Sequence, residues 1–154
     1  MPVRSAGILV YRRRAARLEV FLVHPGGPFW VKKDEQAWSI PKGEFGEEED
    51  PLAAAIREFT EETGQAIAGD FLPLTPARQP SRKIVHAFAV EGDVDADALI
   101  SNEFELEWPP RSGKLQGFPE IDRGAWFAID EARKRAHAGL VPVLDELVRV
   151  LERR

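Results

Sequence analysis

The amino-acid sequence predicts an α/β protein in which a mixed β-sheet lies between α-helices. Short runs rich in β-branched and aromatic residues alternate with segments of helical periodicity along the 154 residues, and no internal repeat or linker interrupts them. A chain of this length can bury a core of its own. We therefore expect a single domain over residues 1–154, with helices on both faces of its sheet.

Two strands are predicted at the start of the chain, over residues 5–11 and 18–23. The arginine-rich segment between them, residues 12–17, has the composition of a solvated hairpin tip. Residues 38–40 are expected to form a short strand, and the loop 41–43 leads from it into a helix.

Start and stop signals mark that helix. Asp50 is a favourable N-cap, and Pro51 follows at the first helical position, where its missing N–H is not needed. Gly64 stands where a helix ends in the left-handed conformation. The residues expected to form its buried stripe are Leu52, Ala55, Ile56, Phe59 and Thr63.

The second half of the chain is expected to add three strands and two helices. Residues 69–80 are rich in proline and irregular, and a flexible loop is expected at 109–113. Asp130 is the predicted N-cap of a short helix that reaches about His137. The predicted strands are 83–90, 104–108 and 125–129, and the apolar stripe of the last helix is Leu140, Val143, Leu144, Leu147 and Leu151.

Composition excludes several classes of site and partner. The net charge is −5, so the charge balance does not favour nucleic acid or an anionic membrane surface. The absence of cysteine excludes disulfides, thiolate zinc sites and a cysteine nucleophile. The apolar run from Ala6 to Tyr11 is too short for a membrane span or a secretory core, so a cytoplasmic protein is expected.

Three glutamates on the first helix give the strongest functional signal. Glu58, Glu61 and Glu62 are three and four residues apart, so they share one helix face. At about 100° per residue, the centre of this face lies about 130° from the centre of the apolar stripe. Carboxylates held this close repel one another unless a cation joins them, and a divalent metal that prefers oxygen ligands suits the group.

An acidic helix face is more often a solvated surface, with Arg57 paired to Glu61 at i,i+4. That alternative does not require Gly43, Glu49 or Gly64 at fixed distances from the acids. The combination of all these positions therefore favours a metal site.

The segment from Gly43 to Gln65 resembles the signature of the Nudix hydrolase family. That signature reads Gly, five residues, Glu, seven residues, Arg-Glu-apolar, one residue, Glu-Glu, one residue, Gly and an apolar residue. Gln65 is the one departure, and we expect it to affect packing after the helix and to leave the acidic face intact. The positions in register are Gly43, Glu49, Arg57, Glu58, Phe59, Glu61, Glu62 and Gly64.

The resemblance implies the Nudix fold, an α/β/α sandwich over nearly the whole chain, and a role for each matching residue. Arg57 would orient the acids by ion pairing, Glu61 would take part in catalysis, and Glu49 would support the cluster from the edge of the helix. The implied ligands of Mg²⁺ or Mn²⁺ are Glu58, Glu61, Glu62 and the backbone carbonyl of Gly43.

Many Nudix hydrolases use one further acid, on a loop ahead of the last strand and often six residues before a tryptophan. Glu120 stands six residues before Trp126, so we choose Glu120 as the fourth metal-binding carboxylate and general base. An exposed loop acid is the alternative for Glu120. Its rivals for the role are Glu103, Glu105 and Glu107.

Substrate contacts are less strongly indicated. Lys42 stands beside the metal loop and is a candidate for a phosphate contact, as are Lys83 and Arg82 on the neighbouring strand.

One aromatic residue near the cleft could stack on a base, although core packing is the commoner role. The aromatic candidates are Trp30, Trp38 and Phe45, and the scattered histidines His24, His86 and His137 are expected to be structural or exposed.

These features predict a metal-dependent pyrophosphohydrolase in which water attacks a diphosphate linkage in line. The expected substrate is a small nucleotide, a nucleoside diphosphate linked to another group. Residues 38–44 resemble the relatives that cleave dinucleoside polyphosphates, although Arg82 stands where that group often has a tyrosine. Pro80, fifteen residues past Gln65, has a spacing that resembles ADP-ribose pyrophosphatases. A dinucleoside polyphosphate or a nucleoside triphosphate is the favoured substrate, and ADP-ribose or a nucleotide sugar is the alternative. A non-catalytic nucleotide-binding module is the competing class, and the intact set of acids disfavours it.

Overall fold

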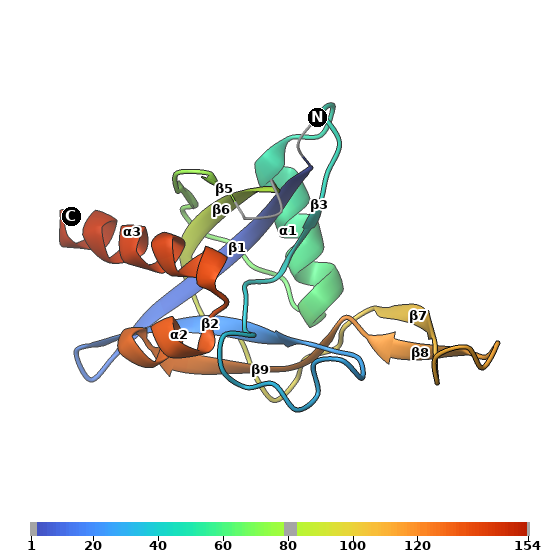
Figure 1. The fold of residues 1–154 in the computed structure, drawn as a ribbon. Helices are drawn as coiled ribbons and strands as arrows, with labels where there is room; N and C mark the ends of the chain where they lie inside the picture. Colours follow the sequence, from blue (N-terminus) through green and yellow to red (C-terminus); the bar gives the residue numbers. More distant parts are fainter. Residues whose placement is uncertain (1–2, 79–82, 154) are drawn as a thin grey trace.

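The computed structural model of the protein describes residues 3–78 and 83–153. Within these residues, seven strands form one mixed sheet and two more form a separate hairpin (Figure 1). The order along the sheet is β4-β6-β1-β2-β9, with β3 paired to β1 and β5 paired to β6. The strands are β1 (Arg4–Arg14), β2 (Arg17–Pro25), β3 (Lys42–Glu44), β4 (Leu72–Pro73), β5 (Ala77–Arg78), β6 (Ile84–Glu91), β7 (Glu103–Glu107), β8 (Leu115–Pro119) and β9 (Ile121–Ala128). The helices are α1 (Pro51–Thr63), α2 (Ile129–Arg135), the 3₁₀ turn η1 (Ala138–Leu140) and α3 (Val141–Glu152).

β1 lies at the centre of the sheet, parallel to β6 and antiparallel to β2 and β3. Successive side chains of a strand point to opposite faces. Ile8 and Val10 therefore join the core under one face, and Leu9 and Tyr11 join the core under the other. Both faces are covered, which explains why this strand reads as a continuous apolar run.

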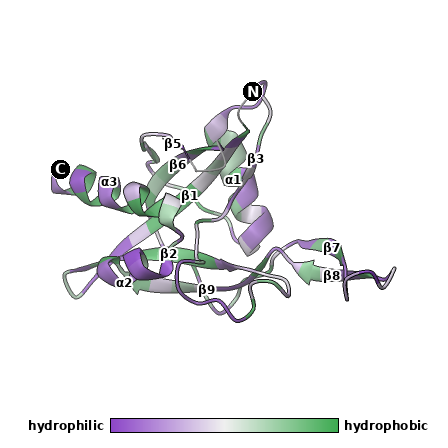
Figure 2. Ribbon diagram, in the orientation of Figure 1, coloured by the Kyte–Doolittle hydropathy of each residue, from purple (hydrophilic) through white to green (hydrophobic). Residues whose placement is uncertain are grey.

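α1 covers one face of the sheet, and α2 and α3 cover the other (Figure 1). Phe59 of α1 packs in the core that contains Phe21 of β2, whereas Leu144 of α3 packs in the core that contains Leu22. Figure 2 shows the matching hydropathy, with β2 largely hydrophobic and α2 largely hydrophilic. The predicted α/β class, a mixed sheet between helices, is confirmed. No helix in the described part of the chain is long and apolar enough to cross a membrane.

The signals at both ends of α1 act as predicted. The Asp50 carboxylate accepts a hydrogen bond from the N–H of Ala53 at 3.0 Å. Gly64 adopts a left-handed conformation with φ of 73°, and its N–H donates to the carbonyl of Thr60. A Cβ at Gly64 would also lie 2.9 Å from Ile100, so both conformation and packing require glycine there.

The prediction for α2 was wrong at both ends. Ala128 is the N-cap residue and makes no side-chain capping bond, whereas Asp130 lies in the first turn and pairs with Arg133 at 2.7 Å. The helix ends at Arg135 because the chain becomes extended at Ala136, so His137 lies outside it. Strand β9 begins four residues before the predicted 125.

All five residues predicted for the apolar stripe of the last helix are buried, but Leu140 lies in the preceding turn η1 and only the other four belong to α3. The irregular segment before β6 contains the short strands β4 and β5, which pair with β6. Strand β8 was not predicted, because its sequence LQGFP contains glycine and proline and its side chains are mostly exposed. The β7–β8 hairpin projects from the rest of the fold, and the predicted loop 109–113 lies at its tip (Figure 1).

The segment that precedes α1 is fixed by a close approach of two backbones. Trp38 and Ser39 make only isolated bridges, and the paired strand is Lys42–Glu44, which we had predicted to be a loop. β3 pairs with the start of β1, and the N–H of Ile8 donates to the carbonyl of Pro41 at 3.2 Å. A Cβ at Gly7 would lie 2.6 Å from that carbonyl oxygen. Glycine at position 7 therefore permits the loop before α1 to sit against the sheet.

We predict that Gly7→Ala lowers the free energy of unfolding by about 1–3 kcal/mol, because the added methyl meets the Pro41 backbone oxygen as well as Cβ of Lys42 and Cδ1 of Ile40. Denaturant titration followed by circular dichroism measures the change. Gly46→Ala is the matched control, because a Cβ there has no neighbour within 4 Å, and it should change stability by less than about 0.5 kcal/mol. Equal stability of the two variants would contradict the role assigned to Gly7.

Candidate active site

The acidic face of α1 lies against β3. A Cβ at Gly43 would lie 2.5 Å from Oε1 of Glu58, so the absence of a side chain at residue 43 lets that carboxylate lie against the backbone without being displaced. The N–H of Lys42 donates to Oε1 of Glu62 at 3.2 Å. The strand therefore holds two of the three predicted acids beside the loop that enters the helix.

The guanidinium of Arg57 lies among the carboxylates of the acidic cluster. Its guanidinium donates to Glu49 and, at 3.2 Å, to Oε1 of Glu58, and its Nε lies 3.7 Å from Oε1 of Glu61. These carboxylates together raise the pKa of Arg57 despite the opposing effect of desolvation. Arg57 therefore pairs with Glu58 and Glu61, and it also pairs with Glu49 at the edge of the helix.

Glu62 is the most deeply buried of the three acids. Burial raises its pKa to about 8, against the effects of the Lys42 backbone N–H and the Lys42 charge. The neighbouring carboxylates of Glu58 and Glu120 raise the pKa further. Burial also raises the pKa of Glu58, where the charge of Glu61 acts in the same direction. The electrostatic field at this place favours a proton or a cation.

Glu120 is brought to α1 by backbone hydrogen bonds that cross several elements. The N–H of Asn102 donates to the Glu61 carbonyl at 3.0 Å, and the N–H of Glu120 donates to the Asn102 carbonyl at 2.8 Å. The Glu120 carbonyl accepts from the N–H of Gly26 at the end of β2. Glu120 is the single residue between β8 and β9, so it cannot move independently of either strand.

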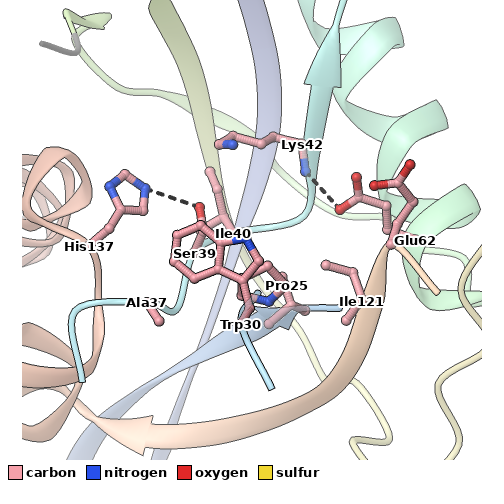
Figure 3. A pocket seen from close by; sticks show the side chains of 11 residues that line it. Pro25, Trp30, Ala37, Ser39, Ile40, Lys42, Glu62, Ile121 and His137 are labelled. Atoms are coloured by element: carbon pink, nitrogen blue, oxygen red, sulfur yellow. Dashed lines mark hydrogen bonds between the residues drawn. The ribbon is translucent and has the colours of Figure 1, made fainter. Parts of the chain in front are cut away.

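A pocket of about 320 Å³ opens beside this group of residues (Figure 3). Glu62 and Glu120 line it, together with Lys42. His137 and Glu62 lie at opposite ends in Figure 3. The full set of lining residues is Val23, Pro25, Trp30, Ala37, Ser39, Ile40, Lys42, Glu62, Glu120, Ile121 and His137.

Lys42 is the cation of the pocket. Its ammonium group lies on the side toward His137 (Figure 3). Burial lowers the pKa of Lys42, and the nearby charge of Lys83 lowers it further, whereas Glu62 raises it. Among the described residues, no carboxylate lies within 4 Å of its Nζ in an ion pair. A buried cation of this kind is suited to an anionic ligand.

The carboxylates supply the oxygen ligands that a hard divalent cation prefers, although they do not surround a single point. In residues 3–78 and 83–153, no three Asp, Glu, His or Cys side chains converge as a metal-binding group. Arg57 instead neutralises part of the cluster from its solvent side. The available donors are carboxylate oxygens and the Gly43 carbonyl, the ligand type that Mg²⁺ and Mn²⁺ prefer.

The structure separates the sequence-predicted candidates. The rivals of Glu120 lie on β7 with exposed side chains and do not line the pocket. Lys83 is exposed ahead of β6 and is close enough to influence Lys42 without lining the pocket. Arg82 and Pro80 lie outside the described residues. Gln65, the departure from the signature, exchanges two side-chain hydrogen bonds with the backbone of Asp95, at 2.8 and 3.0 Å.

The structure also shows which of the candidate aromatic residues and histidines line the pocket and which lie in the core. Trp30 lines the pocket, whereas Trp38 is only 3% exposed in the core and Phe45 packs under α1. His24 is buried and bonded to Asp122 at 2.8 Å, as expected of a structural histidine. Ser39 and His137 line the pocket, and neither was selected from the sequence. No local signal marks them, because they meet only through the contact between the end of α2 and the segment before β3.

Comparison with known proteins supports the signature. A family model of the NUDIX domain matches residues 1–147. The RNA pyrophosphohydrolase of Rhizobium meliloti is 31% identical over 138 residues, which cover 74% of this chain and 76% of that protein. The asymmetrical bis(5'-nucleosyl)-tetraphosphatase of Caenorhabditis elegans is 37% identical over 62 residues, which cover 40% of this chain and 41% of that protein.

A solved structure of Ap4A hydrolase from C. elegans, in a binary complex, has the same fold. Its TM-score is 0.65 at 21% sequence identity, and the match covers 99% of each chain. The predicted pyrophosphohydrolase is confirmed at the level of the family. The chain therefore belongs to the Nudix hydrolase family, as the spacing of residues 43–65 predicted.

Proposed function

We propose that the protein hydrolyses a diphosphate linkage in a nucleoside diphosphate that is linked to another group, with Mg²⁺ or Mn²⁺ as cofactor. The observation that carries this proposal is the buried carboxylate of Glu62 in a pocket that also holds Glu120 and the buried ammonium of Lys42. This combination offers negative oxygens for a cation and positive charge for a phosphate in one cavity. A cytoplasmic location stays a prediction of the sequence.

We assign the metal ligands as predicted: Glu58, Glu61, Glu62 and the Gly43 carbonyl from the α1 side, and Glu120 from the other. A bound divalent cation would neutralise phosphate oxygens and lower the pKa of water. Arg57 holds Glu58 and Glu61 in position by ion pairing. Lys42 binds a phosphate as a point charge, with Lys83 adding positive potential nearby.

The proton of the attacking water requires an acceptor. Glu120 lines the pocket and is fixed at its backbone N–H and carbonyl, so it is the proposed general base. The carboxylate of Glu61 on α1 is the second proposed catalytic group. In-line attack on phosphorus requires this kind of fixed geometry more than covalent chemistry by the protein.

The substrate class favoured is a dinucleoside polyphosphate or a nucleoside triphosphate. The names of the relatives, an RNA pyrophosphohydrolase and a tetraphosphatase acting on bis(5'-nucleosyl) compounds, both describe cleavage within a polyphosphate attached to a nucleoside. ADP-ribose or a nucleotide sugar is the alternative suggested by Pro80. A regulatory module that binds nucleotide without cleavage is the competing class, and the complete acid set argues against it.

We expect the wild-type protein to release product from at least one member of a panel of nucleoside triphosphates, dinucleoside polyphosphates and nucleotide sugars, and only with Mg²⁺ or Mn²⁺. Glu61→Gln should lower turnover by about 10²–10⁴-fold because it removes a charge from the acidic face while the exposed side chain leaves the fold intact. Chromatography of the products also locates the attacked phosphorus. Tight nucleotide binding without release under any divalent metal would favour the regulatory module.

Glu120 and its rivals can be separated by a matched pair of variants. Glu120→Gln should lower kcat by about 10²-fold or more, because it neutralises the acid in the pocket. Glu105→Gln, an equally conservative change on the exposed face of β7, should leave kcat within about twofold. A larger loss of kcat in Glu105→Gln than in Glu120→Gln would instead assign the general base to β7.

The raised pKa of Glu62 predicts a pH dependence of stability in the metal-free protein. Between its ordinary value of 4.5 and about 8, the folded state binds a proton that the unfolded state has released. The stabilisation from this proton is therefore complete below about pH 4.5 and is lost as pH rises through about 8. Thermal unfolding at pH 5 to 8.5 measures this loss.

Glu62→Gln keeps the oxygen that accepts from Lys42 but has no proton to lose, so its stability should decline less over the same range. Added Mg²⁺ should stabilise the wild type more at pH 8 than at pH 6, because the cation requires the ionised carboxylate. Parallel pH profiles for the variant and the wild type would contradict the burial of Glu62.

A further inference from the structure

Three groups that line the pocket have no part in the chemistry proposed above: the Trp30 ring, the Ser39 hydroxyl and the His137 imidazole. They come from three separate places in the chain: the loop after β2, the segment before β3, and the turn after α2. Figure 3 places His137 away from the acids, with Trp30 between His137 and Glu62. A ligand whose phosphates lie between Lys42 and Glu62 would extend toward these groups.

Trp30 presents a large apolar surface to solvent beside the pocket. It is 39% exposed, whereas the other aromatic candidates are buried or packed under α1. Lys33 lies over its ring, with Nζ 5.0 Å from the centroid. An exposed aromatic ring at the mouth of a charged pocket is suited to stacking on a flat, weakly solvated group.

The loop that carries Trp30 is held in place at its far end. The Asp34 carboxylate accepts from Nε1 of Trp38 at 3.1 Å and pairs with Arg135 of α2. The buried ring of His24 contacts the carbonyl of Lys33. Because the loop is tethered before any ligand arrives, stacking on Trp30 would require little ordering of the chain.

The end of the pocket away from Glu62 carries a hydrogen-bonding pair, on the side where the Lys42 ammonium also lies (Figure 3). Oγ of Ser39 and Nε2 of His137 are 3.3 Å apart, and the N–H of His137 donates to the Trp38 carbonyl at 2.9 Å. Burial and the charge of Lys42 lower the pKa of His137, so its ring is neutral at pH 7. A neutral imidazole and a hydroxyl each offer a donor and an acceptor.

We propose that Trp30, Ser39 and His137 form a nucleobase subsite, in which the base stacks on Trp30 and its polar edge hydrogen-bonds to the Ser39–His137 pair. The pocket volume of about 320 Å³ is at the small end for ligand sites, so it holds one nucleotide unit and leaves the rest of the substrate outside. The subsite rests on the proposed function for the identity of its ligand as a nucleotide. Trp30 sets affinity for bases in general, and the polar pair sets the preference among them.

The test uses the protein with Mg²⁺ present and calorimetry with AMP and GMP, which have no diphosphate linkage to cleave, and with ribose 5-phosphate as the probe without a base. Wild-type protein should bind AMP or GMP about 10-fold or more tightly than ribose 5-phosphate. Trp30→Ala should abolish that difference, and Trp30→Phe should retain most of it because the ring is kept. Phe29→Ala is the control, since Phe29 is the more exposed neighbour that contacts Trp108 instead of the pocket.

His137→Ala should change the ratio of the AMP and GMP affinities by about threefold or more and leave binding of ribose 5-phosphate unaltered. Circular dichroism melting confirms that each variant is folded. Equal binding of the nucleotides and ribose 5-phosphate by the wild type, or no detectable binding of either nucleotide, would overturn the stacking role. An unchanged AMP-to-GMP ratio in the His137 variant would overturn the role of the polar pair. Failure of the wild type to hydrolyse any nucleotide would instead contradict the proposed function, because these binding measurements do not depend on hydrolysis.

Discussion

The contact between β3 and the acidic face of α1 is the constraint on which the rest of the site depends. Glu58 lies against the residue 43 backbone, where glycine leaves room for its carboxylate, and Glu62 accepts a hydrogen bond from the N–H of Lys42. Gly7 permits a close approach of two backbones where β1 meets the loop before β3, because a Cβ there would lie 2.6 Å from the Pro41 carbonyl oxygen. Two glycines without side chains thus bring a sheet, a loop and a helix close enough to form a site.

This close approach places several carboxylates near one another, and positively charged side chains lie beside them on two sides. On the solvent side, Arg57 pairs with three carboxylates around it. On the pocket side, Glu62 is too buried to be stabilised by water, and Lys42 compensates only in part, since burial raises the pKa of Glu62 to about 8. The carboxyl group that the protein's own groups compensate least therefore lies where a cation and a phosphate would bind.

The remaining walls of the pocket are positioned by backbone hydrogen bonds between segments distant in sequence. The carbonyls at the end of α1 accept from Ile100 and Asn102, and Asn102 in turn accepts from Glu120. The carbonyls at the end of α2 accept from residues 36–38, which orients the loop that carries Trp30 and brings His137 to Ser39. The ends of two helices, where carbonyls lack intrahelical partners, act as the attachment points.

The sequence by itself determined the fold class, the bounds of α1, the apolar stripe of α3 and the acidic face with its family signature. These are local patterns: a cap, a helical period and a fixed spacing act within a few turns of one element. Its errors at Asp130 and over β8 arose where a local preference was weak and tertiary packing decided the outcome. Only the tertiary structure decided that Glu120 lines the pocket while Glu105 faces solvent, that Trp30 rather than Trp38 borders it, and that His137 meets Ser39. The spacing to Trp126 singled out Glu120, but its place in the pocket and the meeting of His137 with Ser39 depend on contacts between distant segments, up to about a hundred positions apart, which local patterns do not determine.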